Sequence, residues 1–493
     1  MANKLKFSIL AKYPNTNIML QDKGTKKIWE LKKDFTHRWL EVDFLLTIIK
    51  AFHFSTLIKS FSDFKKRGYG FELVLSALIS QVFMGDSSIN GMVINKRGTF
   101  SFLKKDVFYR LKGNPAINWR VILWKFSMQF VKIMEQKSEQ HQGIRCLILD
   151  DSLLEKTGKA IERISRVWDH VKHRGVLGFK LNLMGYWDGF SFIPVDFSLH
   201  REKGKNKKKP FGLTKKDIKK QFKKRRPVEL CSKERVKEAD ETKIETGLKM
   251  FKRAIKRGFK VDYLLMDSWF TNNAFIEAVR NVKNQTVHLI GMYKIAKTKF
   301  EYNNKAMTYS QIRNELGKYK RNRKTGLHYL EAEAMLKGKP IKLFFSRKGK
   351  RGKWKTFITT NTRLSFSKMI EIYQIRWTIE VFFKESKQLL GLGTDQANDF
   401  DSQIAATTIT LLQHILITTR FRFDNYESKG KLFRQAKAEV LQISLSERLW
   451  GLLLQLLKLI IELFEQVDED ELMEKILEDE KTYRRIEKLL EQV

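Results

Sequence analysis

Two short apolar runs that end directly at aspartates constrain the fold more than any other feature of this chain. Ile144–Leu149 leads into Asp150 and Asp151, and Val261–Met266 leads into Asp267. Short apolar runs bounded by polar residues are typical of buried strands. Helical and strand patterns follow in turn at 241–256, from 273 and at 287–292. Strands alternating with helices predict an α/β fold.

The charge of the chain points to a polyanionic partner. Its 493 residues include 95 Lys and Arg against 55 Asp and Glu, a formal net charge of +40. Such an imbalance favours a partner that releases counterions when basic side chains neutralise it. Nucleic acid is the leading candidate, and an acidic membrane surface or a ribosomal environment are the alternatives. The apolar residues are spread through globular-looking segments and not confined to one basic amphipathic helix, which favours nucleic acid.

Length and composition set further bounds. A chain of this length predicts two or three packed units. Its two cysteines, Cys146 and Cys231, exclude a disulfide framework and a four-cysteine zinc site, and fit a reducing compartment. Met1–Tyr13 lacks the apolar core of a signal peptide, and the most apolar stretch, Leu449–Val467, is interrupted by polar residues as in an amphipathic helix. We therefore predict no membrane span and a cytoplasmic location.

Changes in composition and hydrophobic periodicity along the chain predict four regions. Residues 1–140 are mainly helical and suit the recognition of a nucleic-acid end. An α/β core comprises 141–293 and 354–395, and a β-rich insertion, 294–353, lies between its two parts. Residues 396–493 are helical and turn acidic beyond Glu462, which suits a protein contact such as oligomerisation better than nucleic acid.

A basic segment follows two predicted strands, 176–187 and 190–199, that Asp188-Gly189 joins in a hairpin. About half of residues 201–226 are Lys or Arg, so the segment should not pack. It is interpreted either as a solvated clamp on duplex phosphates or as a disordered solubilising loop. Pro210–Gly212, near its middle, indicates a partial anchor.

Three acids are placed to do chemistry: Asp151, Asp267 and Glu380, the last within a predicted long amphipathic helix, Ser365–Leu390. Carboxylates from neighbouring strand ends and a packed helix can hold two divalent ions about 3.5–4 Å apart. Mg²⁺ needs few protein ligands, because waters and substrate phosphate complete its octahedron. The alternative for each acid, taken singly, is a turn or surface residue.

The predicted helix also carries a motif of fixed spacing. Tyr373, Arg376, Glu380 and Lys387 share one face at about 100° per residue. The spacing Tyr-x-x-Arg-x-x-x-Glu-x-x-x-x-x-x-Lys matches the Tyr-Arg-Glu-Lys signature of a branch of bacterial insertion-sequence DDE transposases, the insertion sequence four type. Leu149–Ser152, followed by Glu155, Lys156 and Gly158, resembles the block around the first catalytic acid of that family. Leu264–Ser268 resembles the block around the second. The resemblance spans about Ile144 to Leu392.

The resemblance implies a ribonuclease-H-like mixed-sheet core, interrupted by the β insertion and flanked by helical regions. It implies that Asp151, Asp267 and Glu380 are catalytic and hold two Mg²⁺ ions, for which Mn²⁺ can substitute. Asp150 is the alternative first ligand. Asp151 is preferred because the acid directly before Ser or Thr matches the family better.

The same resemblance implies a set of DNA contacts. Tyr373, Arg376 and Lys387 are expected at the transposon-end phosphates, and Trp377 is expected to help hold a flipped base. Trp354 is a candidate stacking surface for that base, with core packing as the alternative reading, and Trp269 is similarly ambiguous.

The implied function is a DNA transposase. Such an enzyme binds terminal inverted repeats, cleaves each end by Mg-dependent hydrolysis and transfers the 3′-hydroxyl strand into target DNA, commonly through hairpin ends. Its partner would be double-stranded DNA, its end-paired form a homodimer, and its location the nucleoid. The alternatives are a ribonuclease-H-like repair or junction nuclease and a domesticated, non-catalytic DNA-binding protein.

Overall fold

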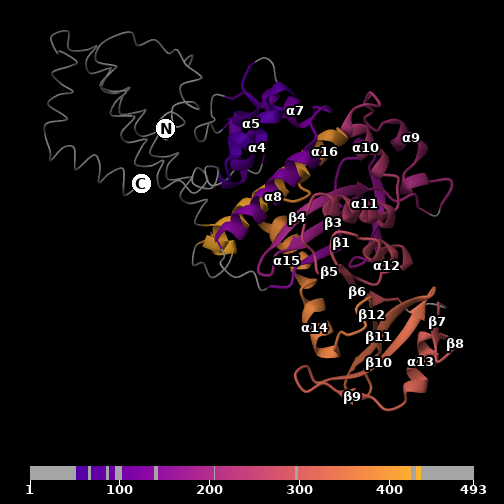
Figure 1. The fold of residues 1–493 in the computed structure, drawn as a ribbon. Helices are drawn as coiled ribbons and strands as arrows, with labels where there is room; N and C mark the ends of the chain where they lie inside the picture. Colours follow the sequence, from indigo (N-terminus) through magenta and orange to yellow (C-terminus); the bar gives the residue numbers. More distant parts are fainter. Residues whose placement is uncertain are drawn as a thin grey trace, which may run out of the picture. The chain divides into compact units, whose positions relative to one another are not determined.

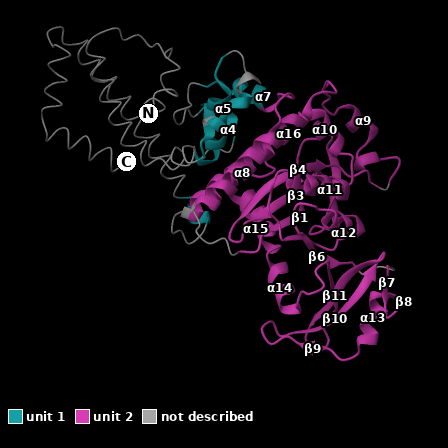
Figure 2. Ribbon diagram, in the orientation of Figure 1, with its two compact units in different colours: residues 1–111, 425–493 teal, residues 112–424 magenta. Residues whose placement is uncertain are grey.

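The computed structural model describes residues 52–64, 68–84, 88–94, 103–137, 143–204, 206–294, 298–423, 429–432 and 434. Its contacts divide the chain into two compact units, residues 112–424 and residues 1–111 with 425–493 (Figure 2). The four regions expected from the sequence stay a prediction. The apolar stretch Leu449–Val467 and the acidic end beyond Glu462 lie outside the described residues.

The described part of the unit formed by residues 1–111 and 425–493 is helical within 1–111. It contains α4 (Phe54–Ile58), α5 (Phe71–Ser80), α6 (Ile89–Ile94) and α7 (Lys105–Lys112), whose last residue begins the other unit, with 3₁₀ turns at Lys59–Phe64 and Gln81–Met84. The helical pattern predicted near Phe71 is confirmed, and α5 buries most of its side chains.

A mixed sheet lies at the centre of unit 112–424 (Figure 1). The strands are β1 (Cys146–Glu155), β2 (Ser165–Asp169), β3 (Arg174–Trp187), β4 (Phe192–His200), β5 (Tyr263–Met266), β6 (His288–Tyr293), β7 (Lys299–Tyr302), β8 (Lys305–Thr308), β9 (Lys320–Arg321), β10 (Leu327–Leu336), β11 (Lys339–Lys348) and β12 (Lys355–Thr359). Their order is β2-β3-β1-β5-β6-β12-β11-β10-β7-β8, with β4 beside β3 and β9 beside β10.

The part of the sheet that positions the candidate site is β4-β3-β1-β5-β6. Strand β3 is antiparallel to both β4 and β1, whereas β1, β5 and β6 are mutually parallel neighbours. The predicted hairpin at Asp188-Gly189 is confirmed, and Gly189 adopts a φ of +107° that a side chain would disfavour. This open, mixed α/β arrangement is compatible with a ribonuclease-H-like core.

Helices cover the sheet around β1. On one side lie α8 (Trp119–Lys137), α15 (Trp377–Leu389) and α16 (Phe400–Phe423), which contact β4, and α15 also contacts β1. On the other side lie α11 (Lys243–Lys256) and α12 (Asn273–Arg280). Helix α11 approaches closely at Gly247, where a Cβ would lie 2.8 Å from the Leu149 side chain. Between β6 and β12 the chain adds β7–β11 and α13 (Tyr309–Leu316).

The single helix predicted for Ser365–Leu390 is wrong in one respect, because the chain forms α14 (Phe366–Gln374) and then α15 with a turn between them. At the turn, the N–H groups of Ile375 and Arg376 bond to the carbonyls three residues earlier, each at 3.0 Å. Both residues keep right-handed helical angles, so the apolar periodicity continues through the turn. Periodicity alone could not reveal the break.

The basic segment 201–226 is also more ordered than predicted. It forms a 3₁₀ turn at Pro210–Gly212 and α9 (Lys215–Lys219), and a capping box of Thr214 and Asp217 begins that helix. At its end, Arg226 is buried and pairs with Glu162, Asp399 and Asp401. The segment packs because acids elsewhere in the chain neutralise its last basic residues.

Candidate active site

Two acids meet at the carboxyl ends of the parallel strands β1 and β5. The pairing of Leu149 with Met266 places Asp150 and Asp267 one step further along, at the same edge. Burial raises the pKa of Asp150 to about 7, and Asp267 adds to that rise while Arg376 opposes it. Burial likewise raises the pKa of Asp267, although its carboxylate accepts hydrogen bonds from the N–H groups of Phe270 and Trp269. Neighbouring desolvated carboxylates of this kind favour the binding of a cation.

Arg376 brings the third acid to the same place. Its Nη1 lies 2.8 Å from Asp150 Oδ2, and its Nη2 lies 2.5 Å from Glu380 Oε1. The guanidinium, at the start of α15, therefore joins an acid from β1 to an acid from α15. Its side chain is largely buried, so the pairing is desolvated.

The same three acids suit a divalent metal chemically. Asp150, Asp267 and Glu380 offer hard carboxylate oxygens, which Mg²⁺ prefers. Among the described residues, no three acids, histidines or cysteines already stand in an arrangement that holds a metal ion. Because Arg376 bridges two of the acids, its guanidinium supplies the compensating positive charge here, and it would have to release them before an ion could share them.

Asp151 lies on the opposite face of β1. Side chains alternate along a strand, and Asp151 pairs with Lys243 Nζ of α11 at 3.0 Å and approaches Lys180 Nζ of β3 at 3.8 Å. It is still near enough to Asp267 to add to the rise in that residue's pKa. The geometry thus favours Asp150 as the first metal ligand, whereas the sequence favoured Asp151. Asp150 and Ser152 share the face that meets α15.

The other signature residues also point toward the ends of β1 and β5. The Tyr373 hydroxyl donates to the Met266 carbonyl at 3.3 Å, and burial raises its pKa to about 12. Lys387 Nζ donates to Ser152 Oγ at 2.8 Å, and burial lowers the pKa of Lys387 with help from Lys180. Tyr373, Arg376, Glu380 and Lys387 therefore converge on one edge of the sheet, despite the turn between α14 and α15.

Two exposed tryptophans flank the acids. Trp377, next to Arg376, is 62% exposed, and Trp269, two residues after Asp267, is 54% exposed. Lys243 Nζ lies 5.0 Å and Lys294 Nζ 5.9 Å from the centre of the Trp269 ring. Both indoles are accessible enough to contact a ligand.

Trp354 lies in the β-rich segment, where it contacts arginines. The guanidinium carbons of Arg347 and Arg313 lie 4.5 and 5.8 Å from the centre of its ring. The Trp354 side chain is partly exposed, so it could either pack against the protein or contact a ligand.

Two lysines near the acids, Lys180 and Lys243, were not identified as candidate site residues from the sequence. Lys180 interrupts an apolar strand and is only 6% exposed, and Lys243 begins the helix that packs on Leu149. A lone lysine in a buried strand is itself a signal, because burying its charge requires a partner. That partner, Asp151, became visible only with the pairing of β1 and β3.

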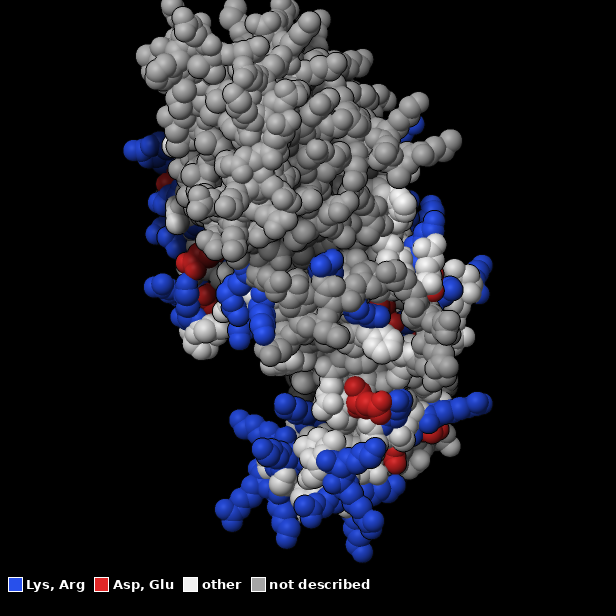
Figure 3. Space-filling model, turned by 90° about the vertical axis from the view of Figure 1, so that its left-hand side faces the viewer, with Lys and Arg blue, Asp and Glu red and all other residues white. Residues whose placement is uncertain are grey.

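Basic side chains also crowd the β-rich segment. Residues 298–355 include 17 Lys and Arg against four Asp and Glu. Figure 3 shows Lys and Arg gathered over the lower part of the molecule, where these strands lie. Such a surface suits the phosphates of a nucleic acid.

Comparisons with known proteins point to one superfamily. Residues 232–416 match the family model described as "Transposase DDE domain", and residues 118–293 match the model described as "DDE superfamily endonuclease". These matches support a DDE-superfamily enzyme of the transposase or endonuclease type, a group that acts on DNA and generally depends on divalent metal ions. A search of curated proteins found no match to this chain.

Among the helices within the described ranges, none combines the length and the apolar character that crossing a bilayer requires.

Proposed function

We propose that the chain is a DDE transposase that cleaves the ends of a mobile DNA element and joins them to target DNA. We further propose Asp150, Asp267 and Glu380 as its catalytic acids, in place of the set with Asp151. One observation carries the proposal: Arg376 joins Asp150 and Glu380 beside Asp267, at the edge where β1 and β5 end. The two matches to DDE domain models add support, because together they include all three acids.

The three acids would hold two Mg²⁺ ions, with Mn²⁺ as a substitute. When bound, the ions neutralise charge on the attacking and leaving oxygens and make a reactive nucleophile available at neutral pH. Asp150 and Asp267 are poised for this role, because their burial leaves them poorly stabilised as free carboxylates.

Arg376 and Lys387 would move to the substrate. Once Arg376 releases Asp150 and Glu380, its planar guanidinium can pair with two oxygens of one DNA phosphate. Lys387 can exchange the Ser152 hydroxyl for a second phosphate. Positioning and charge neutralisation supply most of the catalysis in phosphoryl transfer, so neither residue needs to carry a proton.

Finer points follow from the family resemblance and belong to the same proposal. The enzyme would be of the insertion sequence four branch, with terminal inverted repeats bound by residues 1–140, hairpin end intermediates and Trp377 beside a flipped base. Pairing two ends would need a homodimer, with residues 396–493 as its contact region. The working location would be the nucleoid.

The test compares neighbouring aspartates on opposite faces of β1. Purified wild type, Asp150→Asn, Asp151→Asn and Glu380→Gln are incubated with Mg²⁺ and a duplex that carries the terminal repeats flanking the gene. We expect Asp150→Asn and Glu380→Gln to lose cleavage by about a thousandfold or more while they still bind the duplex. Asp151→Asn is the matched control and should cleave.

Two results would count against the proposal. Cleavage by Asp150→Asn would remove that residue from the catalytic set. Cleavage by the wild type without any joining of ends to target DNA would indicate a repair or junction nuclease instead.

A further inference from the structure

Trp269 presents an exposed indole on a tightly held turn next to the candidate metal ligand Asp267. The Trp269 N–H donates to Asp267 Oδ1 at 2.9 Å, and the Thr271 hydroxyl donates to the Asp267 carbonyl at 2.7 Å. Thr271 also packs on Gly291 of β6, where an added Cβ would clash with the Thr271 hydroxyl. The turn is fixed on both sides, yet the Trp269 side chain is 54% exposed. A large aromatic surface held in place without being buried suits a stacked ligand.

Two lysines from different elements hold ammonium groups near that indole. Lys243 Nζ, from the first residue of α11, lies 5.0 Å from the ring centre. Lys294, which directly follows β6 and is exposed, places its Nζ 5.9 Å from the same centre. Surfaces that hold single nucleotides combine these parts, because a base stacks on the ring and its phosphate pairs with the cations.

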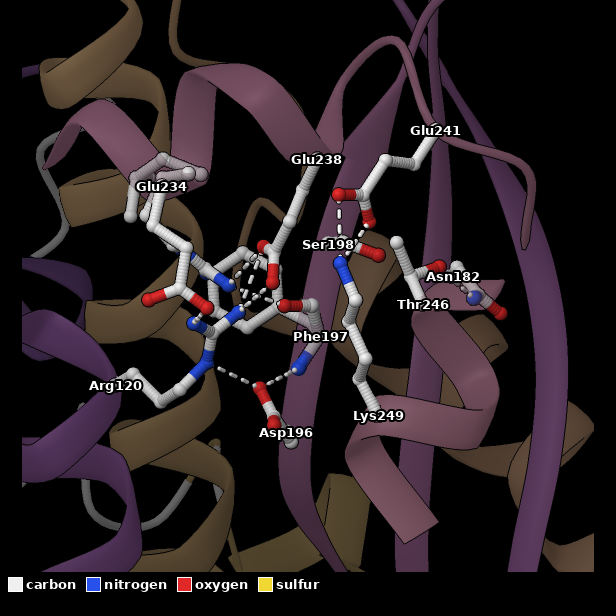
Figure 4. Close-up of polar contacts among 12 residues, drawn as sticks. Arg120, Asn182, Asp196, Phe197, Ser198, Glu234, Glu238, Glu241, Thr246 and Lys249 are labelled. Carbon is white, nitrogen blue, oxygen red and sulfur yellow. Dashed lines mark hydrogen bonds and ion pairs between the residues drawn. The ribbon is translucent and has the colours of Figure 1, made fainter. Parts of the chain in front are cut away.

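The position of Lys243 is fixed by contacts other than the indole. The Asn182 amide donates to the Lys243 carbonyl at 2.9 Å and to the Thr246 hydroxyl at 3.0 Å, and Figure 4 shows Asn182 beside Thr246. Lys243 Nζ lies 3.0 Å from Asp151 Oδ1, and Lys180 Nζ lies 3.8 Å from Asp151 Oδ2. Two ammonium groups therefore share one carboxylate, which leaves positive charge beside the indole.

The indole and the signature residues approach the acids from opposite faces of the sheet. Asp150 meets Arg376 of α15 on one face of β1. Asp151 meets Lys243 of α11 on the other face, and Trp269 lies next to Lys243. A DNA strand that crosses the acids has the mobile element on one side of the cleaved bond and other DNA on the other side. Because the signature residues of α15 are the proposed contacts of the element, the α11 face is left for the DNA beyond the bond.

Resting on the proposed function, we infer that Trp269, Lys243 and Lys294 bind the DNA beyond the cleaved bond. That DNA is flanking DNA before cleavage and target DNA during joining. One base, unstacked from its neighbours, lies on the indole, and its phosphate lies between the two ammonium groups. The Asp267 carboxylate does not repel this phosphate in the working enzyme, because the proposed metal ions neutralise it.

The first experiment measures duplex binding by fluorescence anisotropy in Mg²⁺, with every variant made in a Glu380→Gln background that should bind DNA without cutting it. One labelled duplex ends at the cleavage position of the terminal repeat, and a second continues into the flanking DNA. Adding Trp269→Ala and Lys294→Ala should weaken binding of the longer duplex about tenfold and leave binding of the shorter duplex unchanged.

The matched control is Trp168→Ala with Lys249→Ala in the same background. It also removes one exposed indole, on β2, and one lysine ammonium, on α11. Figure 4 shows Lys249 paired with Glu241, at 2.6 Å. This control should bind both duplexes with the affinity of the background protein. Both double variants should keep its unfolding temperature, because the side chains that they remove are exposed or half-buried.

The second experiment distinguishes target DNA from flanking DNA, with Glu380 intact. Pre-cleaved ends are joined to a target duplex whose concentration is varied. If the indole takes target DNA, Trp269→Ala with Lys294→Ala should raise the KM for the target about tenfold with little change in kcat. If it takes flanking DNA alone, only the affinity for the longer duplex should fall.

An unchanged affinity for the longer duplex, together with an unchanged KM for the target, would overturn the inference. The proposed function fails on a different result, namely a wild type that neither cleaves nor joins DNA. In that case the binding comparison still decides whether the indole and its lysines hold DNA.

Discussion

Replacing Asp150 with asparagine should stabilise the metal-free protein at high pH, although we propose that the same change abolishes catalysis. The unfolded chain ionises this carboxyl near its ordinary pKa of 3.8, whereas the folded protein keeps the proton until about pH 7. The folded state therefore binds more protons between these values, and its stability falls as the pH rises through that window.

The size of the effect follows from the two pKa values. A rise from 3.8 to about 7 corresponds to about 4 kcal/mol of stability lost on ionisation, an upper figure because the side chain retains some exposure. Asparagine has the shape of the protonated acid and cannot ionise. We therefore expect Asp150→Asn to exceed the wild type by about 2–4 kcal/mol at about pH 8 and to equal it near pH 4.

The assay is urea unfolding of the full chain in a metal chelator at both pH values, with Asp151→Asn as the control. Asp151 pairs with Lys243, so its replacement should lower stability, by about 1 kcal/mol at about pH 8. Added Mg²⁺ should stabilise the wild type at the higher pH and leave Asp150→Asn unchanged. An Asp150→Asn protein that is less stable than the wild type at both pH values would refute this reasoning.

Other predictions concern packing, aromatic contacts and charge. Arg226→Met should lower stability by about 3–5 kcal/mol in thermal unfolding, because it leaves Glu162 buried without its cation and Asp401 with Lys224 alone. An unchanged unfolding temperature would contradict that pairing. Trp377→Ala should slow end processing by more than tenfold while a fluorescence assay of duplex binding changes little, whereas Trp377→Phe should retain most activity. Duplex affinity should fall steeply as the salt concentration rises. Neutralising Lys348, Lys350 and Arg351 together should reduce the slope of log affinity against log salt by about three if all three contact phosphates. An unchanged slope would place DNA elsewhere on the chain.

Much of the central sheet could be predicted from local pattern. Ile144–Leu149 and Val261–Met266 are apolar runs of strand length, and the structure has β1 and β5 at these positions. The helix predicted at 241–256 is confirmed as α11, which a capping box of Thr242 and Glu245 begins. These signals are local, so one sequence is enough to read them.

The identity of the first acid depends on information that is not local. Asp150 and Asp151 are adjacent, and alternation places them on opposite faces without saying which face meets α15. That choice is settled by the helices packed on each side, through Arg376 on one and Lys243 on the other. The family match on the acid before serine favours Asp151, whereas our proposal of Asp150 rests on the packing of α15 against β1.

The turn at Ile375–Arg376 could not be foreseen for a related reason. The turn keeps the helical angles that periodicity detects, so it leaves no trace in the pattern of apolar residues.

Anomalous diffraction from Mn²⁺ in crystals of the protein with a terminal-repeat duplex tests the central claim most directly. We predict metal peaks in contact with the carboxylates of Asp150, Asp267 and Glu380, with Arg376 released onto a DNA phosphate. Peaks at Asp151, or a DNA-bound complex in which Arg376 still bridges Asp150 and Glu380, would contradict the account.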